Sequence, residues 1–240
     1  MANKEVGIKF LIWAYFNLDG SEDKKDIIKR CIELAYKDAT NQGAFNAIED
    51  KGAFKTEDAS SELQKIIEKG PTSPFDDWHE TVCKALMKSY TTASEANPPA
   101  FSYGNAQKWL NMTIKYLYIY RGLLDYFSST LLSEGSREFY AFYDEKYATF
   151  ENEFHIPIDS FIMEAIWGST KRESAWVNEE KLPAKGVGAY SGTKHIPWSQ
   201  FDDGVYKSVQ EHVKAQLAGS APMEWENEKW IAVAKKRKNK

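Results

Sequence analysis

The sequence has few of the residues that form metal centres and disulfide frameworks. Its 240 residues include two cysteines, Cys31 and Cys83, and four histidines, none of them paired at His-x-x-x-His spacing. Neither cysteine has a partner at metal-binding spacing, so we predict no catalytic zinc and no other metal or cofactor. Two isolated cysteines within helix-type segments are typical of buried, reduced thiols, and we expect a cytoplasmic protein.

Long apolar runs and phosphate-binding loops are also missing. No apolar run has the length of a membrane span, so we expect no membrane partner. The first 16 residues contain too short an apolar stretch for a signal peptide and lack a small-residue cleavage site. Neither a Walker-type phosphate loop nor a Gly-x-Ser-x-Gly motif occurs, so the signatures of P-loop and serine-hydrolase chemistry are absent.

Positive charge is scarce except at one end of the sequence. The formal net charge of −4 argues against a protein that coats nucleic acid nonspecifically. Residues 235–240 carry five positive charges, so the remainder sums to −9 (−4 minus 5). This basic segment is either a frayed, solubilising end or an arm that contacts phosphates.

Helical periodicity covers most of the sequence. Apolar residues recur at helical spacing, and we expect helices over 22–41, 59–70, 73–94, 107–126, 136–154, 160–167, 204–217 and 224–235. Strand-type alternation is weak, although short strands over 7–14 or 175–177 fit the sequence. We therefore predict a mainly α protein with helical bundle-type domains, in an N-terminal lobe over 1–97 and a second lobe over 98–240.

One helix start, "YGNAQKWLN" (residues 103–111), places a lysine in an unusual position. A glycine turn precedes the helix, and Lys108 falls in its first turns, where the partial positive charge of the helix N-terminus disfavours a cation. Lys108, Asn111 and Lys115 lie three and four residues apart and share one stripe. A core helix with a solvated polar edge would explain the stripe, and so would a functional site.

A second segment, "HIPIDSFI" (residues 155–162), presents a carboxylate at another helix start. Pro157 favours an extended approach to the helix. Asp159 or Ser160 can cap the helix that follows. Capping by itself would account for Asp159.

Together the two segments resemble the helix-hairpin-helix DNA glycosylases, the superfamily of endonuclease III and 8-oxoguanine glycosylase. That family carries a hairpin of the form Leu-Pro-Gly-Val-Gly-x-Lys-x-Ala-Asn, and a later segment Val-Asp-x-His-Ile opens the next helix. Gly104, Lys108 and Asn111 match the hairpin motif, and Asp159 matches the later segment. Ala106 replaces the second hairpin glycine.

Other features depart from the family pattern. Phe161 stands where the family often has histidine. The gap between the lysine and the aspartate is longer than usual, so the resemblance implies an inserted helix over roughly Ser136 to Phe154. No iron–sulfur cysteine set follows the second segment.

The resemblance implies base excision. Lys108 would be the nucleophile that attacks C1′ of the sugar, and Asp159 the carboxylate that stabilises the oxocarbenium-like sugar as the base leaves. Only a neutral amine can attack, and a helix N-terminus and partial burial both favour that form. The position of Lys108, which disfavours a cation in a helix, would then favour its action as a nucleophile.

The resemblance also implies contacts with DNA. The backbone N–H groups of the hairpin and the helix dipole would bind a DNA phosphate, through Gly104, Asn105, Ala106 and Gln107. The flipped base would enter a pocket whose candidate residues are Trp109, Asn111, Tyr116, His155, Phe161 and Trp167. Each of the pocket candidates would also suit the protein core.

A second Gly-Val-Gly occurs in "LPAKGVGAYSGTK", residues 182–194. Pro197 ends any helix there, and Asp202 lies only eight residues after Lys194. The glycine-rich segment 183–197 could instead fold over a substrate or the DNA backbone.

We thus predict a monomeric DNA glycosylase that acts on double-stranded DNA. Its substrate would be an oxidised purine or a modified base of phage DNA, with or without Schiff-base lyase activity. The alternative is a non-enzymatic helical binding module in phage defence or regulation. The identity of the base depends on pocket shape, which the motifs do not encode.

Overall fold

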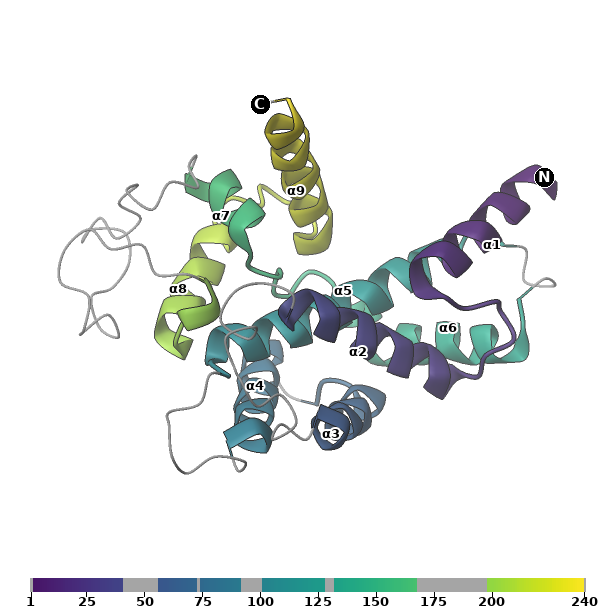
Figure 1. The fold of residues 1–240 in the computed structure, drawn as a ribbon, viewed down its shortest axis with the longest axis horizontal. Helices are drawn as coiled ribbons and strands as arrows, with labels where there is room; N and C mark the ends of the chain where they lie inside the picture. Colours follow the sequence, from purple (N-terminus) through teal and green to yellow (C-terminus); the bar gives the residue numbers. More distant parts are fainter. Residues whose placement is uncertain are drawn as a thin grey trace.

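Helices make up almost all of the structure (Figure 1). The computed structural model describes residues 2–40, 56–72, 74–91, 101–127, 132–167 and 198–239. No strand occurs in this part of the chain, so the mainly α prediction is confirmed. The elements are α1 (Ala2–Phe16), α2 (Lys24–Thr40), α3 (Thr56–Lys69), α4 (Phe75–Thr91), α5 (Tyr103–Leu124), α6 (Glu134–Lys146), η3 (Ala148–Phe150), α7 (Ser160–Trp167), η4 (Trp198–Gln200), α8 (Asp203–Lys214) and α9 (Pro222–Lys238).

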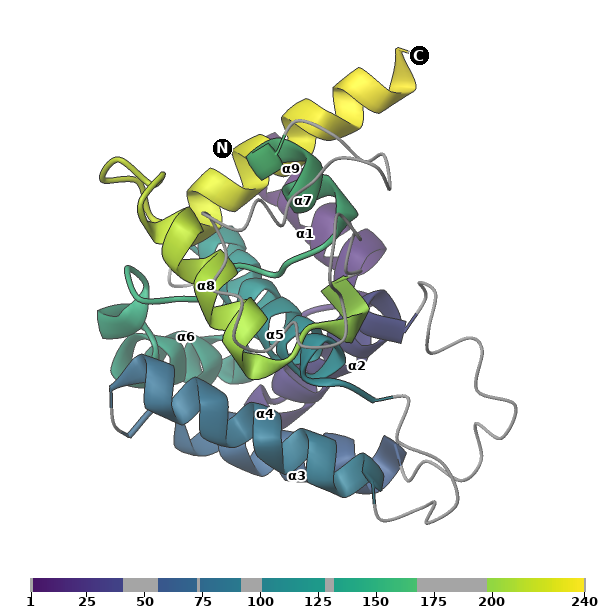
Figure 2. The same cartoon turned by 90° about the vertical axis from the view of Figure 1, so that its left-hand side faces the viewer.

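Helix α5 forms the centre of the fold (Figures 1 and 2). It packs against α2, α4, α6, α8 and η4, and 16 of its 22 residues are buried. A helix enclosed on nearly every side cannot have a solvated polar edge. Its polar side chains therefore need partners inside the protein.

One hydrophobic core includes helices from both predicted lobes. Phe16 and Ile28 from the first lobe and Trp109 and Tyr143 from the second belong to the same cluster of buried residues. Helices α2 and α5 pack extensively against each other across the predicted boundary near residue 98. The predicted inserted helix corresponds to α6 and η3, and α6 packs against α2 and α5.

The segment 7–14, where a strand fitted the sequence, belongs to α1. Ile8, Ile12 and Phe16 lie four residues apart and pack toward the core, which is helical spacing. The strand interpretation was wrong here because apolar residues also lie on the outer side of α1. The second candidate strand, 175–177, and the glycine-rich segment 183–197 lie outside the described residues.

The start of α5 differs from the predicted turn. The helix begins at Tyr103, with Ser102 as its N-cap, so Gly104 lies in the first helical turn. The Gly104 N–H donates to the carbonyl of Phe201 (3.0 Å). A Cβ on Gly104 would lie 2.0 Å from the carbonyl oxygen of Trp198. Glycine is therefore needed here so that η4 can approach the helix closely.

Helix α9 continues through the basic segment. Residues 235–238 are helical, so they are not a frayed end. The Arg237 guanidinium donates to Glu164 (2.9 Å) and to the carbonyl of Ser160 (3.0 Å), and it lies 3.8 Å from the centroid of the Phe161 ring. These contacts attach α9 to α7. Nowhere in the described residues does a helix combine the length and the hydropathy needed to cross a bilayer.

Candidate functional site

Lys108 and Asp159 meet at a pocket of about 410 Å³. The Nζ atom of Lys108 lies 3.1 Å from Oδ2 of Asp159, although 51 residues separate them in the sequence. The pocket walls come from α1, α2, α5, α7, η4 and α9. Its volume falls in the range of small-molecule sites, about 300–1,000 Å³.

The two carboxylate oxygens of Asp159 have different partners. Oδ1 accepts from the backbone N–H groups of Phe161 (2.9 Å) and Ile162 (3.0 Å), so it caps α7. Oδ2 faces Lys108 and also accepts from the indole N–H of Trp230 (3.3 Å). The predicted capping role is confirmed, and the same side chain still presents an oxygen to the pocket.

The Lys108–Asp159 pair is nearly enclosed. The side chains are 6% and 14% exposed. Burial alone would raise the pKa of Asp159, but the charge of Lys108 and the N–H groups of α7 outweigh it, so the pKa lies below its ordinary value. Asp159 is therefore ionised at neutral pH. Because desolvation offsets much of the attraction in a buried pair, stability alone is a weak reason for its presence.

A second ion pair lines the same pocket. Lys115, two turns after Lys108 on α5, pairs with Glu226 of α9. The Glu226 side chain is 1% exposed, and burial raises the pKa of its carboxyl despite the charge of Lys115. Helical spacing in the sequence put Lys115 on the same stripe as Lys108, but it indicated no function for Lys115. No motif marks Glu226, which only the packing of α9 brings to the site.

Aromatic rings form much of the pocket wall. Phe161 stacks on Trp230 with ring centroids 4.6 Å apart, and Tyr116 packs against Tyr15 at 5.9 Å. Trp198 of η4 also lines the pocket. Tyr116 and Phe161, two of the candidate pocket residues, thus line the same pocket as Lys108 and Asp159. The two tryptophans were missed because they follow Lys108 by 90 residues or more. Flat aromatic faces suit the binding of a planar ring.

Three other predicted pocket residues do not line this pocket. Trp109 is in the core, where its indole N–H donates to the carbonyl of Ile32 (3.0 Å). Asn111 and His155 belong to a separate polar cluster. Trp167 is the last residue of α7, and its side chain lies outside the described part of the structure. For Trp109 and Asn111, helical spacing did not indicate which side of α5 faces the pocket.

The structure places the four predicted phosphate-contact residues inside the protein. Gly104, Asn105, Ala106 and Gln107 are all buried. The N–H of Gly104 donates to Phe201, the N–H of Asn105 to the Ser102 hydroxyl (3.1 Å), and the N–H of Ala106 to the Ser102 carbonyl (3.1 Å). These donors already have partners inside the protein, and the docking of η4 separates them from any DNA backbone.

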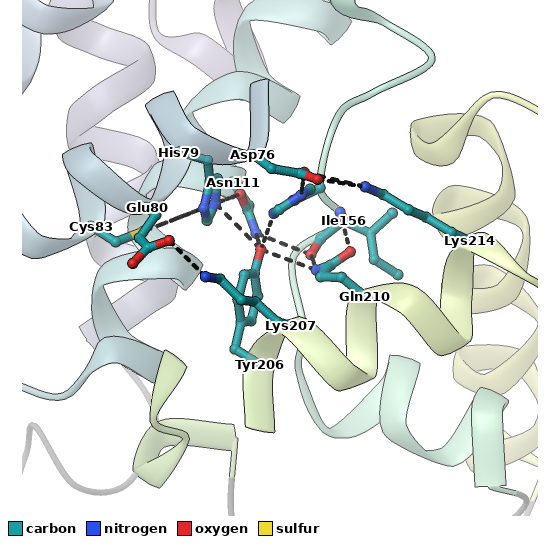
Figure 3. Close-up of polar contacts among 11 residues, drawn as sticks. Asp76, His79, Glu80, Cys83, Asn111, Ile156, Tyr206, Lys207, Gln210 and Lys214 are labelled. Carbon is teal, nitrogen blue, oxygen red and sulfur yellow. Dashed lines mark hydrogen bonds and ion pairs between the residues drawn. The ribbon is translucent and has the colours of Figure 1, made fainter. Parts of the chain in front are cut away.

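A second polar group, the His–Tyr cluster, surrounds Asn111 of α5. It consists of His79, Asn111, Tyr206 and Gln210, which Figure 3 labels, together with His155. The ring centroids of the His79 and His155 imidazoles are 4.3 Å apart. Nδ1 of His155 lies 2.9 Å from the Tyr206 hydroxyl, and the Asn111 amide lies 2.8 Å from both Nε2 of His79 and that hydroxyl. The Gln210 amide also donates to the hydroxyl (3.1 Å).

This cluster holds the segment that leads to Asp159. The amides of Asn111 and Gln210 both donate to the carbonyl of Ile156, at 3.1 and 2.8 Å, and the Ile156 N–H donates back to Gln210 (3.3 Å). Tyr206 is fully buried and its oxygen has several partners. The cluster therefore supports the chain three residues before Asp159. His79, His155, Tyr206 and Gln210 also line a separate pocket of about 180 Å³.

The cluster predicts loss of stability in mild acid. Burial lowers the pKa of His155, and the hydrogen bond between His155 and Asp76 (2.6 Å) offsets only part of this decrease. Burial also lowers the pKa of His79 well below its ordinary value. The unfolded chain binds protons near pH 6.5, while the folded protein does not. Stability is thus fully present above about pH 6.5 and falls below it, by at most about 1.4 kcal/mol per pH unit for each histidine.

Urea unfolding between about pH 7.5 and about pH 5.5 measures this loss. His155→Gln should flatten the dependence on pH, whereas His212→Gln, a change outside the cluster, should leave it as in the wild type. Asp76 is 60% exposed, and its lowered pKa acts only below about pH 3.9, outside this window. An unchanged slope in His155→Gln would contradict the assignment.

Comparison of the chain with protein-family models, curated proteins and solved structures finds no match. Within the described residues, no three His, Cys, Asp or Glu side chains are placed to hold a metal ion. The pocket with its two buried ion pairs, Lys108–Asp159 and Lys115–Glu226, is the feature of the structure that indicates a function.

Proposed function

We propose that the protein is a DNA glycosylase whose catalytic pair is Lys108 and Asp159. The observation that carries the proposal is the 3.1 Å contact between the Lys108 ammonium and the Asp159 carboxylate at the wall of an aromatic-lined pocket. An amine nucleophile, a carboxylate and a slot for a planar ring are the groups that base excision requires. The resemblance of "YGNAQKWLN" and "IPIDSFI" to the helix-hairpin-helix glycosylases supports the same reaction.

The geometry suits a displacement at C1′. The Lys108 ammonium must first release a proton to water, and its amine can then attack C1′ as the base departs. Asp159 remains ionised beside the reacting carbon and stabilises positive charge on the sugar. The flipped base would lie between Tyr116 and the stacked rings of Phe161 and Trp230.

The proposed substrate is double-stranded DNA that contains an oxidised purine or a phage-type modified base. In this proposal α9 contacts the DNA phosphates, because residues 104–107 are buried. Lys235 and Lys238 are exposed and form no ion pair with the described residues, and Trp230 of the same helix lines the pocket. The proposed enzyme acts as a monomer in the cytoplasm.

Borohydride trapping tests the proposal directly. Wild-type protein is incubated with a duplex that carries 8-oxoguanine and with one that carries an abasic site, and borohydride reduces any Schiff base to a stable adduct. A covalent protein–DNA adduct supports Lys108 chemistry. Excision without strand cleavage is detected by alkali treatment of the product. No adduct and no excision with either these duplexes or duplexes from phage DNA with modified bases would contradict the proposal.

Salt dependence of DNA binding tests the role of α9. Removing two phosphate contacts by Lys235→Gln with Lys238→Gln should flatten the slope of log K against log salt by about 1.8 units. The matched control is Lys65→Gln with Lys69→Gln, which removes two exposed charges from α3, on the far side of the fold from α9 (Figure 2). Equal slopes for the two double variants would exclude α9 from the DNA contact.

A binding module is the second candidate function, and α1 supports it. Figure 1 shows the N-terminal end of α1 projecting from the bundle. Five large apolar residues of this helix are 49–67% exposed: Val6, Phe10, Leu11, Trp13 and Tyr15. An exposed apolar surface of this kind marks a contact with a partner. Absence of both excision and DNA binding at low salt would favour this function.

A further inference from the structure

The Lys115–Glu226 pair lies in the pocket but has no role in the attack by Lys108. Lys115 follows Lys108 by seven residues on α5, so both side chains point from one face of the helix, about 10 Å apart along its axis. Both lysines and both of their carboxylate partners line the pocket. A planar base between the two lysines would have one near its sugar and the other near its far edge.

Burial makes a purely structural role for this pair unattractive. The side chains of Lys115 and Glu226 are 12% and 1% exposed. Removing two charges from water carries a large desolvation cost, which their mutual attraction must first offset. Glu226 also lies close enough to feel the charges of Lys108 and Asp159, so the two pairs form one charged site.

Excision needs a proton donor as well as a nucleophile. The glycosidic nitrogen leaves with the bonding electron pair, and a departing neutral base becomes an anion unless it is protonated. Tyr116 lines the same pocket, but its hydroxyl donates to Asp38, and burial raises the pKa of the phenol. A phenol in that state is a poorer acid than a lysine ammonium.

We infer that Lys115 donates the proton that the departing base takes up, and that Glu226 positions Lys115 for this transfer. The inference rests on the proposed excision reaction. In the step, the Lys108 amine forms a bond to C1′ as the C1′–N bond breaks. The electron pair of the broken bond delocalises over the departing ring, and a ring nitrogen on its far edge takes a proton from the Lys115 ammonium. The products are a neutral base, a neutral Lys115 amine beside the Glu226 carboxylate, and a positively charged secondary amine at Lys108.

Lys115→Arg separates this role from a structural one. Arginine keeps the positive charge and the ion pair with Glu226, but it does not give up a proton at neutral pH. We expect an unchanged melting temperature and an excision rate lowered by about 10²–10⁴-fold on an 8-oxoguanine duplex under single-turnover conditions. Excision at the wild-type rate by Lys115→Arg would overturn the inference.

An abasic duplex provides the matched control. No base leaves from it, so Lys115→Arg should still form the borohydride adduct at the wild-type rate. Equal losses on the two duplexes would mean that Lys115 supports pocket shape or Lys108 itself, and would overturn the inference. Glu226→Gln should move the pH profile of excision to lower pH, because it removes the carboxylate that stabilises the Lys115 ammonium. If the wild type acts neither on these duplexes nor on duplexes from phage DNA with modified bases, the proposed function fails first. An active wild type with an unaffected Lys115→Arg refutes the proton donor alone.

Discussion

Lys108→Gln is expected to abolish borohydride trapping and to lower excision by at least about 10³-fold, the scale of effect produced by removing a central catalytic group. Glutamine retains a donor that can reach Asp159, which lies 3.1 Å from the lysine nitrogen in the wild type. It has no amine that could attack C1′. Single-turnover excision and trapping measure the loss.

Stability must be followed in the same variant. Removing one partner of a buried pair costs about 3–5 kcal/mol when the other charge is left alone. The glutamine amide and the Trp230 N–H both still donate to Asp159, so we expect a smaller loss and a folded protein at room temperature. Lys65→Gln, the same chemical change on the exposed face of α3, is the control. Wild-type strand cleavage by Lys108→Gln would refute the nucleophile assignment.

Gly104→Ala is expected to lower the free energy of unfolding by about 3 kcal/mol or more. The added Cβ would lie 2.0 Å from the Trp198 carbonyl oxygen and 3.2 Å from the Phe201 nitrogen. Both are backbone atoms, so no side chain can rotate away. Movement of η4 would break the Gly104–Phe201 hydrogen bond and displace Trp198 from the pocket wall. Urea or thermal unfolding measures the change.

Gly122→Ala is the matched control on the same helix. A Cβ at Gly122 would meet no atom within 4 Å. Alanine should stabilise α5 there by about 0.5–1 kcal/mol because it reduces the entropy of the unfolded chain. Equal unfolding curves for the two variants would show that the close approach of η4 is not required for stability.

Local pattern was enough to predict most helices and one side of the site. The extended approach through Pro157 and the cap at Asp159 are features within one segment, and the spacing on α5 placed Lys108 and Lys115 together. The α1 helix was missed because its apolar residues are not confined to one face, which removes the periodic signal.

Contacts distant in the sequence could not be predicted. The role of Gly104 depends on η4, which begins 94 residues later at Trp198, and the hairpin resemblance suggested phosphate binding instead. Glu226 and Trp230 reach the pocket because α9 packs against α7, and Arg237 supplies some of the contacts between the two helices. Neither residue lies in a motif, so only tertiary structure reveals them.

The pocket combines Tyr15 from the first helix with Glu226 and Trp230 from the last one described. During synthesis from the N-terminus, Lys108 emerges more than a hundred residues before α9 can cover it. Until then, the lysine has neither the Trp230 wall nor the neighbouring Glu226 charge. A nascent chain or fragment that stops before Pro222 thus contains Lys108 without its enclosure, so the proposed chemistry would require docked α9.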